Sequence, residues 1–228
     1  MYVFLAGAMV CLLTSTVCHT LGCCSQHVAN WIWRVDYCGI AVLIVASFYP
    51  PLYYCFQCQA VLKWMYLGTT TAMGAPLYVL TVHAIVHTTI CIPHCKPKHS
   101  CKTSNTGIAA VCVSMLPVFQ TTEYRAFRAA MFAGMGLWGL VPMLHGIVMY
   151  WGQPEVEQAL LWDLLMGALY LLGAGVYAMR VPERWKPGAF DIAFHSHQLF
   201  HVAVVLAAAV HYKAVLILLR WRDATLCV

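Results

Sequence analysis

The sequence predicts an all-α integral membrane protein, a single helical bundle of about six spans over residues 1–228. Two observations predict this fold class. Hydrophobic residues make up 62% of the chain and charged residues only 9%, whereas soluble domains carry roughly 25% charged side chains. The apolar residues also gather in runs of about 20 residues or more, the length that a helix needs to cross a bilayer core. Too few charges remain to cover a water-facing surface, which excludes a soluble globule.

The first part of the chain is expected to contain three spans. Residues 2–22 form an apolar run without the basic start of a secretory signal peptide, so we interpret it as a retained span. The second span covers 37–56, where Pro50 and Pro51 should kink or end the helix. The third covers 64–92 and is longer than a span needs.

The composition changes after the third span. Residues 93–107 are polar and contain proline, as expected for an inserted loop. Residues 108–119 are mostly apolar but too short to cross alone, so we expect a broken or re-entrant piece there. The remaining spans are expected over 126–151, 158–179 and 190–219.

Polar residues near the ends of three spans form the candidate site. Ser15 and His19 lie four residues apart near the end of the first span, which puts a hydroxyl and an imidazole on one helix face. Asp36 opens the second span, and His197 and His201, again four residues apart, open the last one. With five spans before the last, all of these helix ends lie on the same side of the membrane.

Three imidazoles with one open position suit zinc, which keeps a water as its fourth ligand in catalytic sites. Asp36 would hold or deprotonate that water, and Ser15 would support it by hydrogen bonding. The sequence therefore predicts His19, His197 and His201 as metal ligands, and Asp36 and Ser15 as catalytic residues.

A His-x3-His pair by itself is a weak signal, since most such pairs at helix ends are only hydrogen-bonded to each other. His83 and His87 have the same spacing in the third span, with no acid nearby in sequence. A tract rich in cysteine and histidine over 91–101 also resembles a metal site, but its spacings match no familiar zinc arrangement. His197 and His201 are favoured over His83 and His87 as metal ligands because His19 and Asp36 are expected at the same membrane depth.

Three other polar residues inside spans have simpler interpretations. Asp163 is expected to cap its helix at the membrane interface. His145 follows Pro142 and is expected to hydrogen-bond carbonyl groups that the proline leaves free. His211 lies about 15 Å farther along the last helix than His201, which is too far for the two to share a metal.

The formal charge of +5 does not indicate a nucleic-acid partner, because the basic residues are scattered along the chain. Their distribution predicts an orientation instead. In the connecting loops opposite the candidate site Lys63 stands alone, although the carboxyl-terminal end adds three basic residues there. The basic residues on the side of the site are Arg34, Arg125, Arg128, Arg180, Arg184 and Lys186. The positive-inside rule then places the site towards the cytoplasm.

The stretch 180–202, RVPERWKPGAFDIAFHSHQLFHV, resembles the signature of the progestin and adipoQ receptor family, which contains the adiponectin receptors and the haemolysin III-like proteins. The sequence of this stretch is most similar to that of the plant heptahelical transmembrane proteins. Further matching segments are Ser15 to His19, 36–40, 127–145 and 211–223. Together they cover nearly all of the chain outside residues 75–107.

The resemblance implies a seven-helix bundle with its amino terminus in the cytoplasm and a zinc ion near the cytoplasmic face. It also implies roles for five residues. Zinc would be held by His19, His197 and His201, with Asp36 contacting the metal-bound water and Ser15 close by. This assignment agrees with the one reached from spacing and membrane depth.

The chain is expected to depart from the family pattern at two places. Met1 falls where the second family helix should begin, so the six spans resemble helices 2–7 of the family fold. Residues 75–107 look inserted within the fourth family helix. A non-functional product of a misprocessed transcript would explain both departures, and this interpretation stays open at the level of the sequence.

The resemblance implies a multi-pass signalling receptor similar to the adiponectin receptors, surrounded by membrane lipid and with zinc as its cofactor. Animal members of the family bind protein or steroid hormones, so the implied ligand is a protein, a steroid or a lipid. For plant members, roles in hormone, sugar and stress responses are implied more loosely. The alternative function is a zinc-dependent, ceramidase-like hydrolase of sphingolipid amides. The plasma membrane and the endomembranes are both compatible with these functions.

Overall fold

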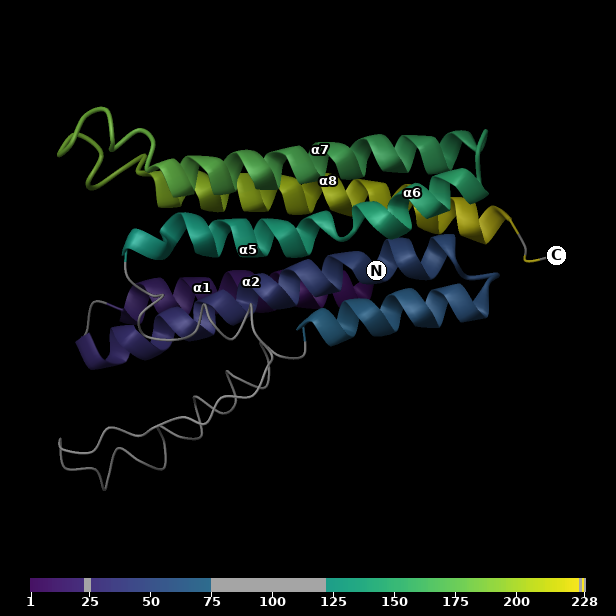
Figure 1. The fold of residues 1–228 in the computed structure, drawn as a ribbon, viewed down its shortest axis with the longest axis horizontal. Helices are drawn as coiled ribbons and strands as arrows, with labels where there is room; N and C mark the ends of the chain where they lie inside the picture. Colours follow the sequence, from purple (N-terminus) through teal and green to yellow (C-terminus); the bar gives the residue numbers. More distant parts are fainter. Residues whose placement is uncertain (23–25, 75–121, 226, 228) are drawn as a thin grey trace, which may run out of the picture.

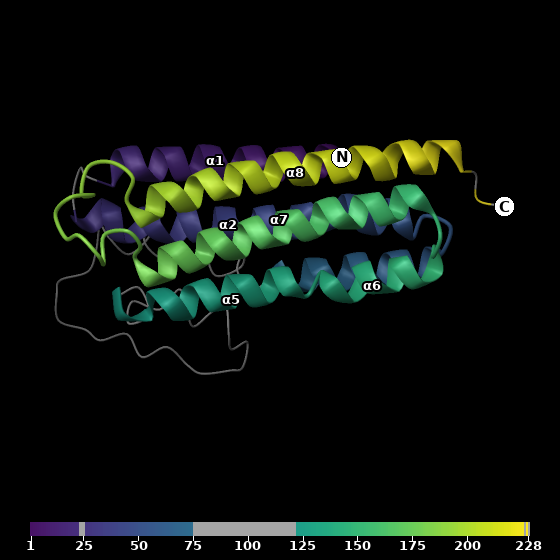
Figure 2. The same ribbon diagram turned by 90° about the horizontal axis from the view of Figure 1, so that it is seen from above.

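The computed structural model describes residues 1–22, 26–74, 122–225 and 227, and the regular structure in these ranges is helical. The helices lie side by side with their long axes in a common direction (Figure 1; Figure 2). They are α1 (Tyr2–Leu21), α2 (Gln26–Cys55), a helix over 60–74, the 3-10 turn η2 (Thr122–Tyr124), α5 (Arg125–Leu137), α6 (Leu140–Met149), α7 (Pro154–Met179) and α8 (Ser196–Ala224). The predicted all-α fold class is confirmed.

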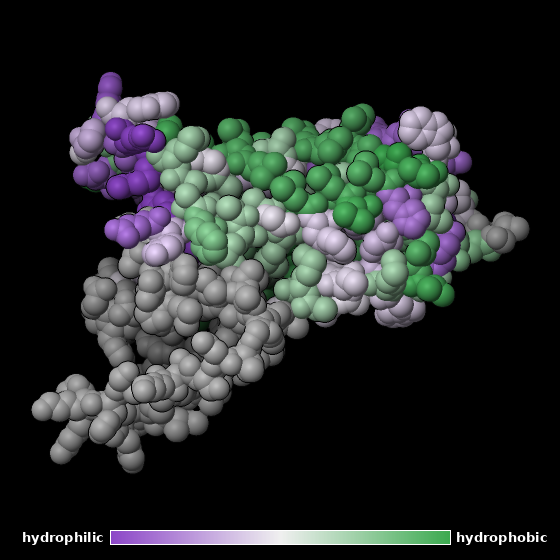
Figure 3. Space-filling view, in the orientation of Figure 1, coloured by the Kyte–Doolittle hydropathy of each residue, from purple (hydrophilic) through white to green (hydrophobic). Residues whose placement is uncertain are grey.

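Five described segments are long and apolar enough to cross a membrane: Tyr2–Leu21, Val35–Cys55, Arg125–Met149, Pro154–Met179 and Ser196–Ala224. Large apolar side chains on these segments face outwards, and Leu13, Val148 and Leu172 are 66%, 74% and 63% exposed. Figure 3 shows an apolar surface along the bundle, with hydrophilic residues concentrated towards its ends. The surface matches a lipid environment, and the chain is an integral membrane protein with several spans, as predicted.

Residues 60–74 form a helix in the region where the third span is expected to begin. The remainder of that expected span, the expected loop 93–107 and the expected re-entrant piece 108–119 lie outside the described residues. His83, His87 and the 91–101 tract lie outside them as well.

The expected span 126–151 consists of two helices, α5 and α6, which part at Trp138 and Gly139. Pro142 causes this break because it has no N–H group to donate to the carbonyl of Trp138, four residues earlier. That carbonyl accepts instead from the N–H of Val141, at 3.1 Å, in a tighter turn.

The last helix begins at Ser196, later than the expected position 190. The preceding residues, which include Pro187 and Gly188, form turns and bends instead of a helix. His195 then starts α8 as its N-cap, because its side chain accepts a hydrogen bond from the N–H of Gln198. His197 and His201 therefore lie in the first turns of a helix whose start is fixed, so the directions of their side chains are well defined.

Glycines bring α1 and α2 into close contact. A Cβ atom on Gly7 would overlap the side chain of Ala46, and one on Gly39 would lie 3.2 Å from the Cα atom of Cys11. The close approach buries a cluster that links these two helices to α8, formed by Phe4, Cys11, Leu43 and Val204. The packing fixes the position of the last turn of α1 relative to the start of α8.

Arg222 fastens the end of α8 to the end of α2. Its guanidinium donates hydrogen bonds to the carbonyl oxygens of Tyr54, at 2.8 Å, and Cys55, at 3.1 Å. The last carbonyls of a helix have no partner within it, so the arginine satisfies groups that would otherwise be left open. A disulfide between Cys58 and Cys227 adds a covalent link at the same end of the bundle. The sequence did not predict this pairing.

Asp163 and His145 have different partners from those expected. Asp163 lies well inside α7 instead of capping it, and its Oδ1 atom is 2.8 Å from Nδ1 of His211. The Nδ1 atom of His145 is 2.8 Å from the hydroxyl of Tyr66, so its partner is a side chain from helix 60–74 and not a freed carbonyl. Both pairs join different helices, and sequence spacing alone does not reveal such contacts.

Candidate metal centre

Three histidine side chains from two helices converge at one end of the bundle. His19 lies in the last turns of α1, and His197 and His201 lie in the first turns of α8. The Nε2 atom of His197 is 2.9 Å from Nε2 of His19 and 3.1 Å from Nε2 of His201. These three residues form a group that could hold a metal ion, because their potential ligand atoms all lie within 4.8 Å of one another.

The spacing of the three nitrogens fits a metal ion after a small adjustment. Zn–N bonds of about 2.0–2.1 Å in a tetrahedral site place the nitrogens about 3.3 Å apart. The two observed separations, 2.9 and 3.1 Å, are a few tenths of an ångström shorter. A neutral imidazole has one donor and one acceptor nitrogen, so a single Nε2 atom facing two others is poorly satisfied by hydrogen bonding alone. A cation coordinated by all three nitrogens would resolve this crowding.

The start of α8 is held by the segment that precedes it. Ser196 is fully buried, and its hydroxyl donates a hydrogen bond of 2.8 Å to Oε1 of Glu183. Burial raises the pKa of the Glu183 carboxyl, but hydrogen bonds from its own backbone N–H and from the hydroxyl and N–H of Ser196 outweigh burial and hold the pKa below its usual value. The carboxyl therefore stays ionised and fixes Ser196, the residue next to His197.

Aromatic rings surround the histidines and limit how they can turn. The ring of Trp33 contacts His19 edge to face with centroids 4.9 Å apart, and the ring of Tyr177 lies 5.4 Å from that of His197. Arg125 places its guanidinium over Tyr177, 4.6 Å from the ring centroid. Such contacts orient the imidazoles before any ligand binds.

The other two expected site residues lie in the same cavity as the histidines. Asp36 and Ser15 are both 6% exposed, and both line a cavity of about 1220 Å³ that the three histidines also line. The Oγ atom of Ser15 is buried and has no hydrogen-bond partner among the described residues. An unsatisfied hydroxyl on the wall of this cavity is consistent with a polar group being bound there. All five predicted residues therefore line a single cavity, and the three histidines converge within it.

The sequence reasoning did not identify the residues that position the histidines. Trp33 stands three residues before Asp36, and this closeness is a local signal that could have found it. Tyr177 and Glu183 reach the site only through the contacts of α7 and its following turns with α8. His195 caps the start of α8, a role that the sequence did not predict.

Comparison with known proteins identifies the family. A family model described as "Haemolysin-III related" matches residues 1–99 and 78–212. Heptahelical transmembrane protein 4 of Arabidopsis thaliana is 47% identical over 226 residues, which are 99% of this chain and 50% of that protein. Heptahelical transmembrane protein ADIPOR3 of Oryza sativa subsp. japonica is 44% identical over 99% of this chain and 48% of its own length.

An animal protein is also similar. The adiponectin receptor protein of Drosophila melanogaster is 38% identical over 93% of this chain and 40% of its own length. The chain spans about half the length of these two curated plant relatives. The chain belongs to the haemolysin-III related family, together with the plant heptahelical transmembrane proteins and the adiponectin receptors.

Proposed function

We propose that this protein is an adiponectin-receptor-like signalling receptor of the membrane, with a zinc site near the cytoplasmic face. The observation that carries the proposal is the convergence of three Nε2 atoms, from His19, His197 and His201, at one point between α1 and α8. The likeness to a protein named as an adiponectin receptor supports the receptor role. In this role the metal is structural.

The positions of the ligands suggest what a structural metal would do. His19 is on α1, and the other two ligands are on α8, so a bound ion joins the first and last described helices. A shift of α8 along α1 changes the separation of His19 from His197 and therefore changes how well the ion is held. Ligand binding in the cavity, which both helices line, has a direct route to such a shift.

Two features support the cytoplasmic orientation of the histidines. The basic residues Arg125, Arg180 and Lys186 lie at the histidine end of the bundle, as the positive-inside rule requires of a cytoplasmic face. The disulfide between Cys58 and Cys227 lies beyond the other end of α2 and near the end of α8. Disulfides persist in oxidising compartments, so that end would face the lumen or the exterior.

A zinc-dependent lipid amide hydrolase is the second candidate function. It is supported by the buried carboxyl of Asp36 and the unsatisfied hydroxyl of Ser15 in a cavity large enough for a lipid chain. Zinc bound by the histidines would polarise a carbonyl and lower the pKa of a water. Asp36 would take a proton from that water, and Ser15 would hydrogen-bond to the reacting group.

Replacement of Asp36 separates the two functions. If the protein is a hydrolase, Asp36→Ala should reduce cleavage of a long-chain N-acylsphingosine by about 100-fold or more, as loss of a general base does. Zinc content should stay unchanged, because the three histidines remain. Purified protein in lipid nanodiscs, assayed for released sphingosine, provides the measurement. Equal activity of wild type and variant, or no activity in either with zinc bound, would favour the receptor with a structural metal.

A further inference from the structure

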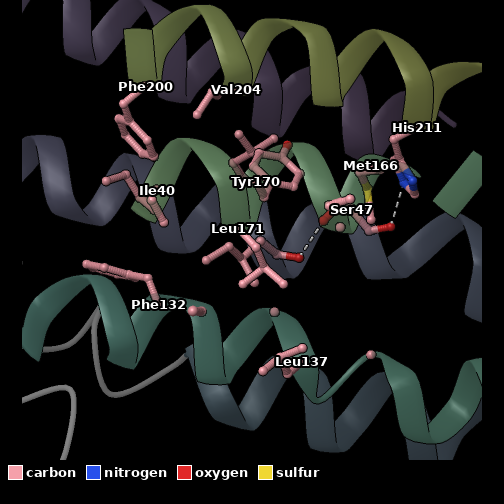
Figure 4. Close-up of a pocket in the computed structure, with 18 of the residues that line it drawn as sticks. Ile40, Ser47, Phe132, Leu137, Met166, Tyr170, Leu171, Phe200, Val204 and His211 are labelled. Atoms are coloured by element: carbon pink, nitrogen blue, oxygen red, sulfur yellow. Dashed lines mark hydrogen bonds between the residues drawn. The ribbon is translucent and has the colours of Figure 1, made fainter. Parts of the chain in front are cut away.

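A second polar group lines the cavity away from the three histidines. His211 of α8, Asp163 of α7 and Ser47 of α2 all contribute to the cavity wall. His211 stands ten residues after His201 on one helix, which places it about 15 Å farther along the bundle. Figure 4 shows His211 above Ser47. Most of the surrounding wall is apolar, including Phe132, Leu137, Leu171, Phe200 and Val204.

Pro51 creates the partner of His211. In an α-helix the carbonyl of Ser47 would accept a hydrogen bond from the N–H of residue 51, but proline has no N–H. The structure fills this vacancy from another helix, since Nε2 of His211 lies 2.9 Å from the carbonyl oxygen of Ser47. A carbonyl oxygen only accepts, so Nε2 must carry a proton.

The other nitrogen of His211 then fixes the charge of the pair. Nδ1 lies 2.8 Å from Oδ1 of Asp163, and a hydrogen bond there requires one further proton. The pair is either an imidazolium with a carboxylate or a neutral imidazole with a carboxylic acid. Its total charge is zero in both cases, which suits a buried position at membrane depth. The second carboxyl oxygen, Oδ2, is an acceptor in both cases.

Oδ2 of Asp163 is the part of this group that has no partner. Oδ1 is used by His211, and no hydrogen bond joins Oδ2 to any described residue. The side chain is nine-tenths buried, with 9% of its surface exposed, and it lines the cavity. Because the pair is neutral overall, it offers little attraction to a cationic ligand. Its natural complement is an uncharged hydrogen-bond donor on a molecule that is otherwise apolar.

We propose that Asp163 is a second ligand-binding group of the cavity and accepts a hydrogen bond from a hydroxyl carried on the hydrocarbon chain of a long amphiphile. The apolar wall packs against the hydrocarbon chain of the ligand, and Asp163 accepts the hydrogen bond from its hydroxyl at membrane depth. This site shares the cavity with the proposed metal centre but none of its residues. The ligand preference it produces is therefore measurable whether or not zinc is bound.

The test compares two fatty acids that differ only in a hydroxyl. The 228-residue chain in nanodiscs is titrated with 12-hydroxyoctadecanoic acid and with octadecanoic acid, each competing with a fluorescent fatty acid. In the extended hydroxy acid the hydroxyl lies roughly 14 Å from the carboxyl carbon, given carbon–carbon bonds of about 1.5 Å. The wild type should bind the hydroxy acid about tenfold more tightly than its parent, the effect expected of one satisfied buried acceptor.

Three substitutions at Asp163 and its surroundings make the test specific. Asp163→Asn should keep the preference, because the amide can donate to Nδ1 of His211 and leave its oxygen facing the cavity. Asp163→Leu should remove the preference. If that variant does not fold because His211 loses its partner, Asp163→Leu/His211→Phe provides the same test without an unpaired imidazole. Met166→Leu, which alters the shape of the neighbouring wall but not its polarity, is the matched control and should keep the preference.

Two outcomes would overturn the proposal. One is equal affinity of the wild type for the two acids, as expected if water alone meets Asp163. The other is an unchanged preference in the leucine variants. His197→Ala/His201→Ala should lose zinc and keep the preference. Absence of zinc from the wild type would therefore count against the metal centre only. A wild type that binds zinc but shows no preference for the hydroxy acid would count against the Asp163 site only.

Discussion

Pro51 shows how one residue determines a contact between distant helices. The sequence predicted that the Pro50-Pro51 pair would kink or end the helix. The pair does not end it, because α2 continues through both prolines to Cys55. Because Pro51 has no N–H, the carbonyl of Ser47 lacks its partner within α2, and Nε2 of His211 on α8 hydrogen-bonds to it instead. Neither the position of the partner nor its link to Asp163 is visible in sequence, because both depend on which helices are neighbours.

Replacement of His211 should be strongly destabilising. His211→Phe leaves the buried carboxyl of Asp163 and the carbonyl of Ser47 without partners, so we expect a loss of about 3–5 kcal/mol in the free energy of unfolding. Denaturant unfolding in detergent micelles, followed by circular dichroism, measures the change. Zinc content should be unaffected.

A double replacement supplies the control for this prediction. Asp163→Leu/His211→Phe removes the buried carboxyl together with its partner, so it should be less destabilising than the sum of the two single variants. Strict additivity of the three unfolding energies would show that the pair does not interact in the way described.

The candidate metal ligands are the residues for which sequence reasoning went furthest. Spacing placed Ser15 with His19 and His197 with His201 on single helix faces, and the number of spans placed both pairs on one side of the membrane. The structure brings these residues and Asp36 to one cavity. The residues that orient the imidazoles, such as Trp33 and Tyr177, were missed because their role depends on ring contacts across helices.

At the scale of helices, close packing of α1 against α2 depends on glycine. Gly7→Ala places a methyl group on Ala46, and neither side chain has a rotamer that could relieve the overlap. We expect the variant to lose about 1–3 kcal/mol of stability, as overpacked cores do. Thermal unfolding of purified protein in detergent is a suitable measurement.

The same substitution elsewhere provides the matched control. Gly167 lies in the interior of α7, and a Cβ atom there would meet nothing within 4 Å. Gly167→Ala should therefore be neutral or stabilising by up to about 1 kcal/mol, the difference in helix propensity between the two residues. An equal loss of stability in both variants would mean that contact with α2 is not what requires glycine at position 7.

The ends of the helices could be predicted less well than their existence. The sequence indicated apolar runs correctly, but α8 begins after the expected residue 190 because the turns before it need Pro187 and Gly188, and a histidine serves as the cap. The expected span 126–151 breaks in the middle because Pro142 removes one hydrogen bond. In each case a local backbone effect acts inside a stretch that composition alone shows as uniformly apolar.

At the scale of the whole molecule, composition was enough to predict the all-α membrane fold, since a chain with 9% charged residues has few other ways to fold. It was not enough to predict how the bundle is closed at the end away from the histidines. There Arg222 donates to α2, and a disulfide joins Cys58 to Cys227, residues separated by 169 positions. Pairing over such a separation requires the three-dimensional arrangement.

Loss of the disulfide should weaken the fold without affecting the candidate metal site. Cys58→Ser/Cys227→Ser should lower the free energy of unfolding by about 2–4 kcal/mol, because the open chain gains entropy in the unfolded state. Thermal unfolding with and without reductant compares the wild type with the variant. Free thiols at both positions in protein isolated under non-reducing conditions would contradict the pairing. Cys55→Ser, which removes a free cysteine near the same end, serves as the control.

The central claim is that three histidines at the ends of α1 and α8 hold a metal ion. The most direct measurement is elemental analysis of purified wild type beside His197→Ala/His201→Ala, with His195→Ala as a control for an adjacent histidine that caps the helix and is not one of the three candidate ligands. We predict about one zinc ion per chain in the wild type and in His195→Ala, and none in the double variant. Equal zinc in all three proteins, or no zinc in the wild type, would contradict the claim.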